Sequence, residues 1–148
     1  MNQLQSKSPG KKTTNKPVVK IEIPYKPRPY QLEVHNSLKR FSVLVCHRRF
    51  GKSVLAINEL IKTAADKPRS LCAFIAPTYR QGKSIAWEYL KLYTAPLMKY
   101  GGSRIETELR IDLFNHSRIQ IFGADNPDSI RGMGFDKVVM DEYAIMSP

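Results

Sequence analysis

A phosphate-loop pattern is the feature of this sequence that most restricts its fold. Residues 45–54 read VCHRRFGKSV and contain the tripeptide Gly51-Lys52-Ser53. An apolar run at 43–45 precedes the loop, and apolar residues at helical spacing follow it from 53 to 65. A strand, a loop and a helix in this order present backbone N–H groups and the positive end of the helix to phosphate. The pattern therefore predicts a phosphate-binding loop, although Cys46 stands where the usual motif has its first glycine.

The rest of the chain predicts the other elements of an α/β fold. Apolar strands are expected at 43–45, 71–76 and 138–140, helices at 29–40, 53–65 and 81–93, and a β-hairpin with a two-residue turn at Asn115-His116. The helix at 81–93 is expected to bury the stripe Ile85, Tyr89, Leu90 and Tyr93 and to be closed by Pro96 and Gly101-Gly102. Apolar strands separated by helices are typical of a parallel sheet with helices on either side, on which the hairpin is an insertion. We therefore predict a P-loop NTPase-type α/β domain.

Length and charge narrow the class of partner. The 148 residues suit one domain. There are 24 Lys and Arg against 13 Asp and Glu, a net charge of +11, which favours polyanions such as nucleic acid, although solubility alone is the other reading. Residues 1–20 contain five lysines and no acidic or aromatic residue, which indicates a disordered basic arm. Charge leaves open whether this arm contacts DNA or is only solvated.

Cysteine use and hydropathy point to a cytoplasmic protein without a membrane segment. Cys46 and Cys72 lie in apolar stretches and are expected to be reduced and buried in strands. The N-terminal residues lack the apolar core of a secretion signal, and no run approaches the roughly 18 apolar residues that span a bilayer. His35, His47 and His116 have no metal-ligand spacing, so we expect them to be structural or exposed.

Within the loop, each residue type has a chemical rationale. Gly51 lets the backbone approach a phosphate, Lys52 reaches the outer phosphates, and Ser53 can ligate Mg²⁺. Arg48 and Arg49 are adjacent guanidinium groups that repel each other unless an anion lies between them. Triphosphate is such an anion, and an arginine supplied in cis can neutralise charge on a transferring phosphoryl group. A surface pair facing DNA or solvent is the alternative reading.

A second half-site is predicted at the end of the strand at 138–140. This strand runs directly into Asp141-Glu142. Carboxylates at the C-terminal edge of a strand point into the crevice where ligands bind in α/β sheets. The first carboxylate is suited to hold Mg²⁺ and the second to polarise an attacking water. We expect Lys52 and Glu142 to face one magnesium-bound triphosphate.

Tyr25 and Gln31, which precede the phosphate loop in the sequence, are candidates for contact with a nucleotide base. The amide of Gln31 can pair with adenine through N6 and N7. The ring of Tyr25 can stack on the base. Packing of the segment before the first strand explains both residues equally well, so the residues alone leave the choice open.

Together the stretches PRPYQ, CHRRFGKS, IAPTYRQGK and DSIRGMGFDKVVMDEYA resemble the ATPase domain of the large terminase subunit of tailed bacteriophages and prophages. The resemblance runs from about Tyr25 to the end of the chain. It implies an ATPase that uses ATP and Mg²⁺ to drive double-stranded DNA into a preformed procapsid. It also implies a homo-oligomeric ring docked on the portal, a small terminase subunit as partner, and the bacterial host cytoplasm as location.

By position, the resemblance also implies individual roles. Gln31 matches the adenine-reading glutamine and Arg48 the in-cis arginine finger. Lys52 and Ser53 match the phosphate and Mg²⁺ groups, and Asp141 and Glu142 the metal-holding and catalytic carboxylates. An in-trans finger is expected, and Arg104 and Arg110 are two candidates that the sequence does not separate. The expected nucleotide-binding set is Tyr25, Gln31, Arg48, Arg49, Phe50, Gly51, Lys52 and Ser53.

The chain stops shortly after Glu142, whereas members of that family continue through the rest of the ATPase sheet to a nuclease domain. We therefore expect residues 21–148 to be the N-terminal part of the ATPase domain, with weak or no turnover alone. One alternative is a superfamily 2 helicase-like DNA-dependent ATPase, against which stand the glycine-poor loop and the continuation of Glu142 into Tyr143-Ala144. Another is a catalytically incomplete fragment that binds DNA or partner subunits.

Overall fold

The computed structural model describes residues 20–146, so the predicted basic arm lies outside the described residues except for the exposed Lys20. The helical elements are α1 (Pro29–Ser37), α2 (Lys52–Asp66), α3 (Tyr79–Gly82), the π-helical turn η1 (Lys83–Trp87) and α4 (Glu88–Met98). The strands are β1 (Leu71–Ala76), β2 (Gly102–Ile105), β3 (Arg110–Leu113), β4 (Arg118–Gly123) and β5 (Lys137–Met140). Two 3₁₀ turns, η2 (Pro127–Ser129) and η3 (Tyr143–Ile145), follow β4 and β5.

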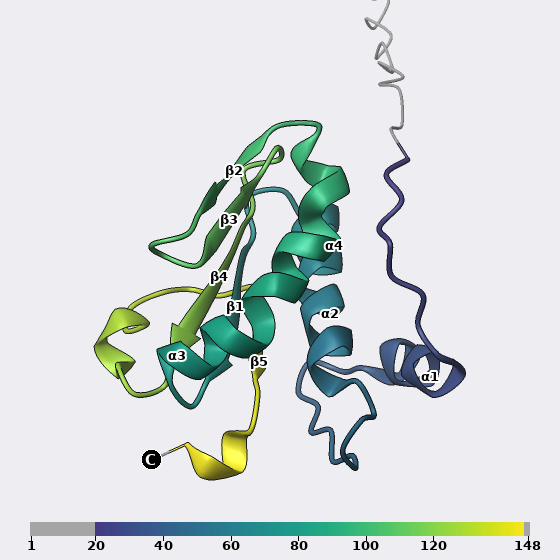
Figure 1. The fold of residues 1–148 in the computed structure, drawn as a ribbon, viewed down its shortest axis with the longest axis vertical. Coiled ribbons are helices and arrows are strands. Elements are labelled where there is room, and N and C mark those ends of the chain that lie inside the picture. The colour runs from purple at the N-terminus through teal and green to yellow at the C-terminus, as the bar shows by residue number, and fades with distance from the viewer. Residues whose placement is uncertain (1–19, 147–148) are drawn as a thin grey trace, which may run out of the picture.

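The strands form one five-stranded sheet in the order β2-β3-β4-β1-β5. β1 is parallel to both β4 and β5, while β2, β3 and β4 form antiparallel pairs. The predicted α/β class is confirmed, and the sheet is mixed instead of wholly parallel. Because β1 and β5 are parallel, with Ile75 opposite Met140, their carboxyl ends share one edge. Figure 1 shows the start of α2 at that same end of the sheet.

The main core lies between the sheet and helices α2 and α4. α2 buries one stripe, Ile57, Leu60, Ile61 and Ala64, each no more than 1% exposed, at the spacing that the sequence predicts. The core on the opposite face of the sheet is smaller. There the segment after β4 covers Ala73, Ile75 and Phe122. Within residues 20–146 the two longest helices therefore share one face, unlike the predicted helices on either side (Figure 1).

The predicted strand at 43–45 is wrong. These residues have no strand conformation, and Val43 and Val45 are 92% and 91% exposed. β5 pairs with β1 alone and forms the edge of the sheet, so the segment makes no ladder. Apolar, β-branched composition favours a strand only where a neighbouring strand and a buried face are available. Cys46 is consequently half-buried in a loop, whereas Cys72 is buried in β1, where burial raises its thiol pKa to about 11.

The helix predicted at 81–93 is longer and faces the core differently. It runs as α3, η1 and α4 from Tyr79 to Met98 and passes through Pro96 without ending. The π-helical turn inserts an extra residue and shifts the buried stripe. Trp87, Leu90 and Leu97 therefore face the core, whereas the predicted Ile85 and Tyr89 are 36% and 41% exposed.

The predicted hairpin forms, but its second strand is integral to the sheet and is not an insertion. β4 lies between β3 and β1. The turn is closed by the N–H of His116 donating to the carbonyl of Leu113 (3.0 Å), so its central residues are Phe114 and Asn115. His116 follows with φ 66°. The amide of Asn115 donates to the carbonyl of Ala64 (2.8 Å), which joins the hairpin to the C-terminal end of α2.

Across residues 20–146, none of the helices is both long enough and apolar enough to cross a bilayer.

Candidate functional site

The first backbone N–H groups of α2 are free to donate, and neither a capping side chain nor an acidic residue of the first turn offsets the positive end of the helix. Its N-cap, Gly51, has φ 88°, provides no side-chain cap, and is followed by a first turn without acidic residues. The first intrahelical bond runs from the N–H of Leu55 to the carbonyl of Gly51 (3.0 Å), so the N–H groups of residues 52–54 have no partner within the helix. Such a terminus attracts anions.

Two side-chain contacts join this helix start to the end of β5. The hydroxyl of Ser53 donates to Oδ2 of Asp141 (3.1 Å). Nζ of Lys52 lies 3.7 Å from Oε1 of Glu142, and the two side chains are 33% and 55% exposed. An ion pair so open to water contributes little to stability and exchanges readily for another partner. The structure thus brings together the four residues that the sequence places in two distant motifs.

Backbone conformation fixes the two carboxylates. The N–H of Asp141 donates to the carbonyl of Ile75 (2.9 Å), which extends the ladder between β1 and β5 by one step. Glu142 then adopts φ 53°, a left-handed conformation that is uncommon for a residue with a side chain. Glu142 therefore leaves the line of the strand at the point where it meets Lys52.

Gln31 ties α1 to the loop. Its Nε2 donates to the carbonyls of Phe50 and Gly51, both at 3.3 Å, and its Oε1 accepts from the N–H of Arg28 (2.9 Å). Gln31 is 4% exposed. A base that paired with this amide would exchange at least one of these bonds, so base reading by Gln31 stays a prediction.

A cavity of about 240 Å³ lies beside Gln31 and Gly51. Tyr25 and Tyr93 also line it, with their rings edge to face and their centroids 5.8 Å apart. Burial is the main cause that raises the pKa of Tyr25 to about 12, and the neighbouring Tyr93 and Glu59 add to it, so the hydroxyl stays protonated. The aromatic wall and the adjoining loop give this cavity the chemistry to hold a base next to phosphates.

The two arginines of the loop, Arg48 and Arg49, both lie at the surface. Arg48 and Arg49 are exposed, and neither guanidinium group makes a hydrogen bond or ion pair within residues 20–146. Arg49 has φ 65°, and its carbonyl accepts from Arg28 (3.4 Å). The ring of Phe50 packs against that of Tyr30 at 4.7 Å. Phe50 therefore packs against α1 in this structure, and the nucleotide contacts predicted for Phe50 and the two arginines stay predictions.

The two candidates for an in-trans finger differ in how they are held. Arg110 lies between the carboxylates of Glu108 and Asp112, and its side chain is 19% exposed. Arg104 is exposed and donates to the carbonyl of Lys91 (3.2 Å). Arg104 could reach a neighbouring molecule at a smaller cost, because it would break no ion pair.

The donor set at the strand end suits a hard cation. Residues 20–146 hold no group of three or more His, Cys, Asp or Glu side chains able to bind a metal. Ser53 and Asp141 instead offer two oxygens 3.1 Å apart next to the free helix terminus. Mg²⁺ is commonly held by one or two protein oxygens together with substrate phosphates, so these two residues fit it.

Sequence reasoning missed one set of polar residues near the site. Glu59, on α2, is 6% exposed and contacts both His35 and Lys137. The sequence around Glu59 does not predict these contacts, because its partners lie on α1 and β5, far away in the sequence.

Alanine at position 51 tests the fit between Gly51 and Gln31. A Cβ there would lie 2.7 Å from Nε2 of Gln31, and φ 88° is strained for alanine. Gly132→Ala is a matched control, since Gly132 has φ 78° and nothing within 4 Å of a Cβ. We expect Gly51→Ala to lower the free energy of unfolding by about 1 kcal/mol more than Gly132→Ala. Equal losses in urea denaturation would contradict this packing.

An uncapped helix start that faces carboxylates at the end of a parallel strand is the arrangement of P-loop nucleotide-binding proteins. No family model matches the chain. Among curated proteins, the large terminase subunits of Thermus virus P23-45 and Thermus phage G20c are each 27% identical to it, over 139 and 148 residues. Each match covers 82% of this chain, and the chain spans 29% of the length of each relative.

Solved structures give the same result. The ATPase domain of the large terminase of Thermus phage P74-26 has a TM-score of 0.73 and 27% identity, and the match covers 83% of this chain and 56% of that domain. A mutant of the same domain has a TM-score of 0.74. The resemblance to the large terminase ATPase domain is therefore confirmed in both sequence and fold.

Proposed function

We propose that this chain is the ATP-binding part of a DNA-packaging motor of the large terminase type. The observation that carries the proposal is the meeting of Lys52 with Glu142, at 3.7 Å, beside the bond from Ser53 to Asp141. These two pairs bring the start of the phosphate loop's helix next to a carboxylate suited to catalysis, although the two segments lie far apart in the sequence. Coupling of hydrolysis to movement of double-stranded DNA into a procapsid rests on the resemblance to the phage relatives.

Each residue has a separate role in this proposal. The ammonium group of Lys52 and the free N–H groups at the start of α2 bind phosphate oxygens. Ser53 and Asp141 would hold Mg²⁺, which when bound supplies neutralising charge to the phosphates. The carboxylate of Glu142 orients a water and accepts its proton. Arg48 is free to turn toward the phosphoryl group that is transferred.

The base occupies the cavity next to the loop in this proposal. Tyr25 and Tyr93 form its aromatic wall, and Gln31 also lines it. The contacts of Gln31 with the carbonyls of Phe50 and Gly51 make loop shape and base position interdependent. A base held there would place its phosphates toward the start of α2.

Titration with ATP tests the binding step. We expect the chain to bind ATP in the presence of Mg²⁺ with a dissociation constant below about 1 mM. We expect weaker binding when EDTA removes the cation. Isothermal titration calorimetry measures both. Absence of binding at several times that concentration would contradict the proposal.

Double-stranded DNA, small terminase subunits, a portal and a homo-oligomeric ring are the partners that the resemblance implies, with the host cytoplasm as the location. The net charge of +11 favours contact with DNA phosphates. We expect the affinity for random-sequence duplex DNA to fall about 100-fold or more between 50 and 200 mM salt, because phosphate contacts release counterions. Fluorescence anisotropy measures this slope, and salt-independent binding would argue against phosphate contacts.

A further inference from the structure

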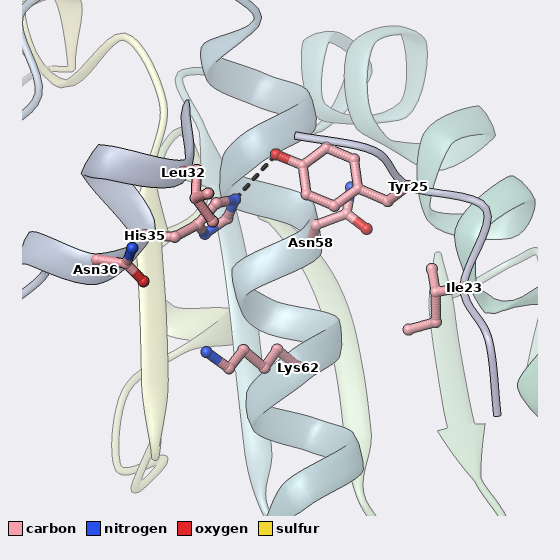
Figure 2. Close-up of a pocket in the computed structure, with 7 residues that line it drawn as sticks. All are labelled: Ile23, Tyr25, Leu32, His35, Asn36, Asn58 and Lys62. Carbon is pink, nitrogen blue, oxygen red and sulfur yellow. Dashed lines mark hydrogen bonds between the residues drawn. The ribbon is translucent and has the colours of Figure 1, made fainter. Parts of the chain in front are cut away.

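A chain of polar contacts crosses the molecule beside the proposed base cavity. The hydroxyl of Tyr25 lies 2.9 Å from Nε2 of His35. Nδ1 of His35 contacts Oε1 of Glu59, and Nζ of Lys137 donates to Oε2 of the same carboxylate at 3.0 Å. Tyr25 precedes α1, whereas the other three residues lie on α1, α2 and β5. Figure 2 shows the first link, with the tyrosine hydroxyl directed at the imidazole.

The centre of this chain is a buried carboxylate with both oxygens engaged. Burial alone would raise the pKa of Glu59, but the hydrogen bonds from His35 and Lys137 outweigh it, so the pKa lies below its usual range. Glu59 therefore carries its charge at neutral pH. One consistent assignment has Nδ1–H of His35 donating to Glu59 and the hydroxyl of Tyr25 donating to Nε2.

One end of this chain of contacts lies at the proposed site, and the other reaches the start of a strand that leads to it. Tyr25 lines the base cavity and contacts the ring of Tyr93. α1, which carries His35, also carries Gln31 with its bonds to the loop. Lys137 begins β5, the strand that leads to Asp141. Glu59 itself contacts neither the loop nor the carboxylates of the strand end.

We propose that Glu59 is a positioning residue for the base side of the nucleotide site, acting through His35 on Tyr25 and α1. The inference rests on the proposed function. Without the carboxylate, His35 loses its anchor on α2, and the segment that carries Tyr25 loses its fixed distance from the helix. The phosphate side keeps Lys52 and Ser53, which begin α2 and need no contact with Glu59.

A comparison of two ligands separates this role from a general structural one. ATP uses both the base and the phosphate sides, whereas inorganic tripolyphosphate uses the phosphate side alone. We expect Glu59→Gln to weaken ATP binding about tenfold and to leave tripolyphosphate binding within about twofold, because one charged hydrogen-bonded anchor is lost. Tyr25→Phe, which removes only the outer hydroxyl, should weaken ATP binding about threefold with the same selectivity.

Calorimetry on the full chain with Mg²⁺ and each ligand measures these affinities. Glu33→Gln is the matched control, since Glu33 is an exposed carboxylate on α1, and it should leave both affinities unchanged. Equal losses for both ligands, or no loss of ATP affinity in a folded Glu59→Gln chain, would overturn the inference while the proposed function stands. If Glu59→Gln fails to fold, Tyr25→Phe decides by the same criterion. A wild-type chain that binds neither ligand would overturn both.

Discussion

Replacement of Lys52 by alanine is expected to lower the affinity for ATP at least about 100-fold. A charged hydrogen bond to phosphate in a partly enclosed site is among the strongest polar contacts, and Lys52 is the first residue of α2. The side chain is a third exposed and its ion pair with Glu142 is open to water, so the substitution leaves the core intact. Calorimetry with ATP and Mg²⁺ measures the loss.

Lys62→Ala is the matched control for this experiment. Lys62 lies on the same helix, is exposed, and lines a neighbouring cavity of about 250 Å³ between α1 and α2, which shares Tyr25 with the proposed base cavity (Figure 2). We expect its loss to leave ATP affinity within about twofold, the usual effect of a surface change away from a ligand. A large loss with Lys62→Ala and none with Lys52→Ala would move the nucleotide to that second cavity.

Glu142→Gln is expected to preserve ATP binding and to reduce hydrolysis by about 100-fold to 10,000-fold, the contribution of a general base. Glutamine keeps the size of the side chain but does not accept a proton from water. It also removes the carboxylate that holds Lys52 at 3.7 Å, so the amine is free for phosphate and ATP affinity should rise slightly. Single-turnover hydrolysis, measured in the protein that carries this chain, separates binding from chemistry.

An exposed carboxylate elsewhere provides the control for hydrolysis. Glu88 is 76% exposed in its side chain and pairs with Lys91 on α4. We expect Glu88→Gln to hydrolyse ATP at the wild-type rate. Normal turnover by Glu142→Gln would remove the role assigned to that residue, and an equal loss in both variants would indicate an effect on folding.

The elements that frame the site could be predicted because local patterns specify them. The apolar residues of α2 recur at helical spacing, and those of β1 form one continuous run. Both sets are buried in the core, as these patterns predict. Gly51, at the start of α2, and Glu142, just after β5, adopt positive φ, and the motifs name both positions. The meeting of Lys52 and Glu142 is expected from two parallel strands ending at one edge, and it occurs although the strand expected at 43–45 does not form.

The remaining features depend on tertiary contacts that no local pattern encodes. Residues 43–45 have strand composition but no ladder, so they stay exposed. The π-helical turn before α4 moves the buried stripe from Ile85 to Trp87. The contact of Glu59 with His35 and Lys137 joins three elements far apart in sequence. Such contacts depend on how the elements pack together, and the spacing of apolar residues along one element does not specify that packing.

A crystal structure of this chain with Mg²⁺ and a non-hydrolysable ATP analogue tests the central claim most directly. We expect the β- and γ-phosphates within hydrogen-bonding distance of Nζ of Lys52, and the cation bound to Ser53 and next to Asp141. We also expect Glu142 to have left Lys52 and to face the γ-phosphate. Triphosphate density away from the start of α2, with Lys52 still paired to Glu142, would contradict the proposed site.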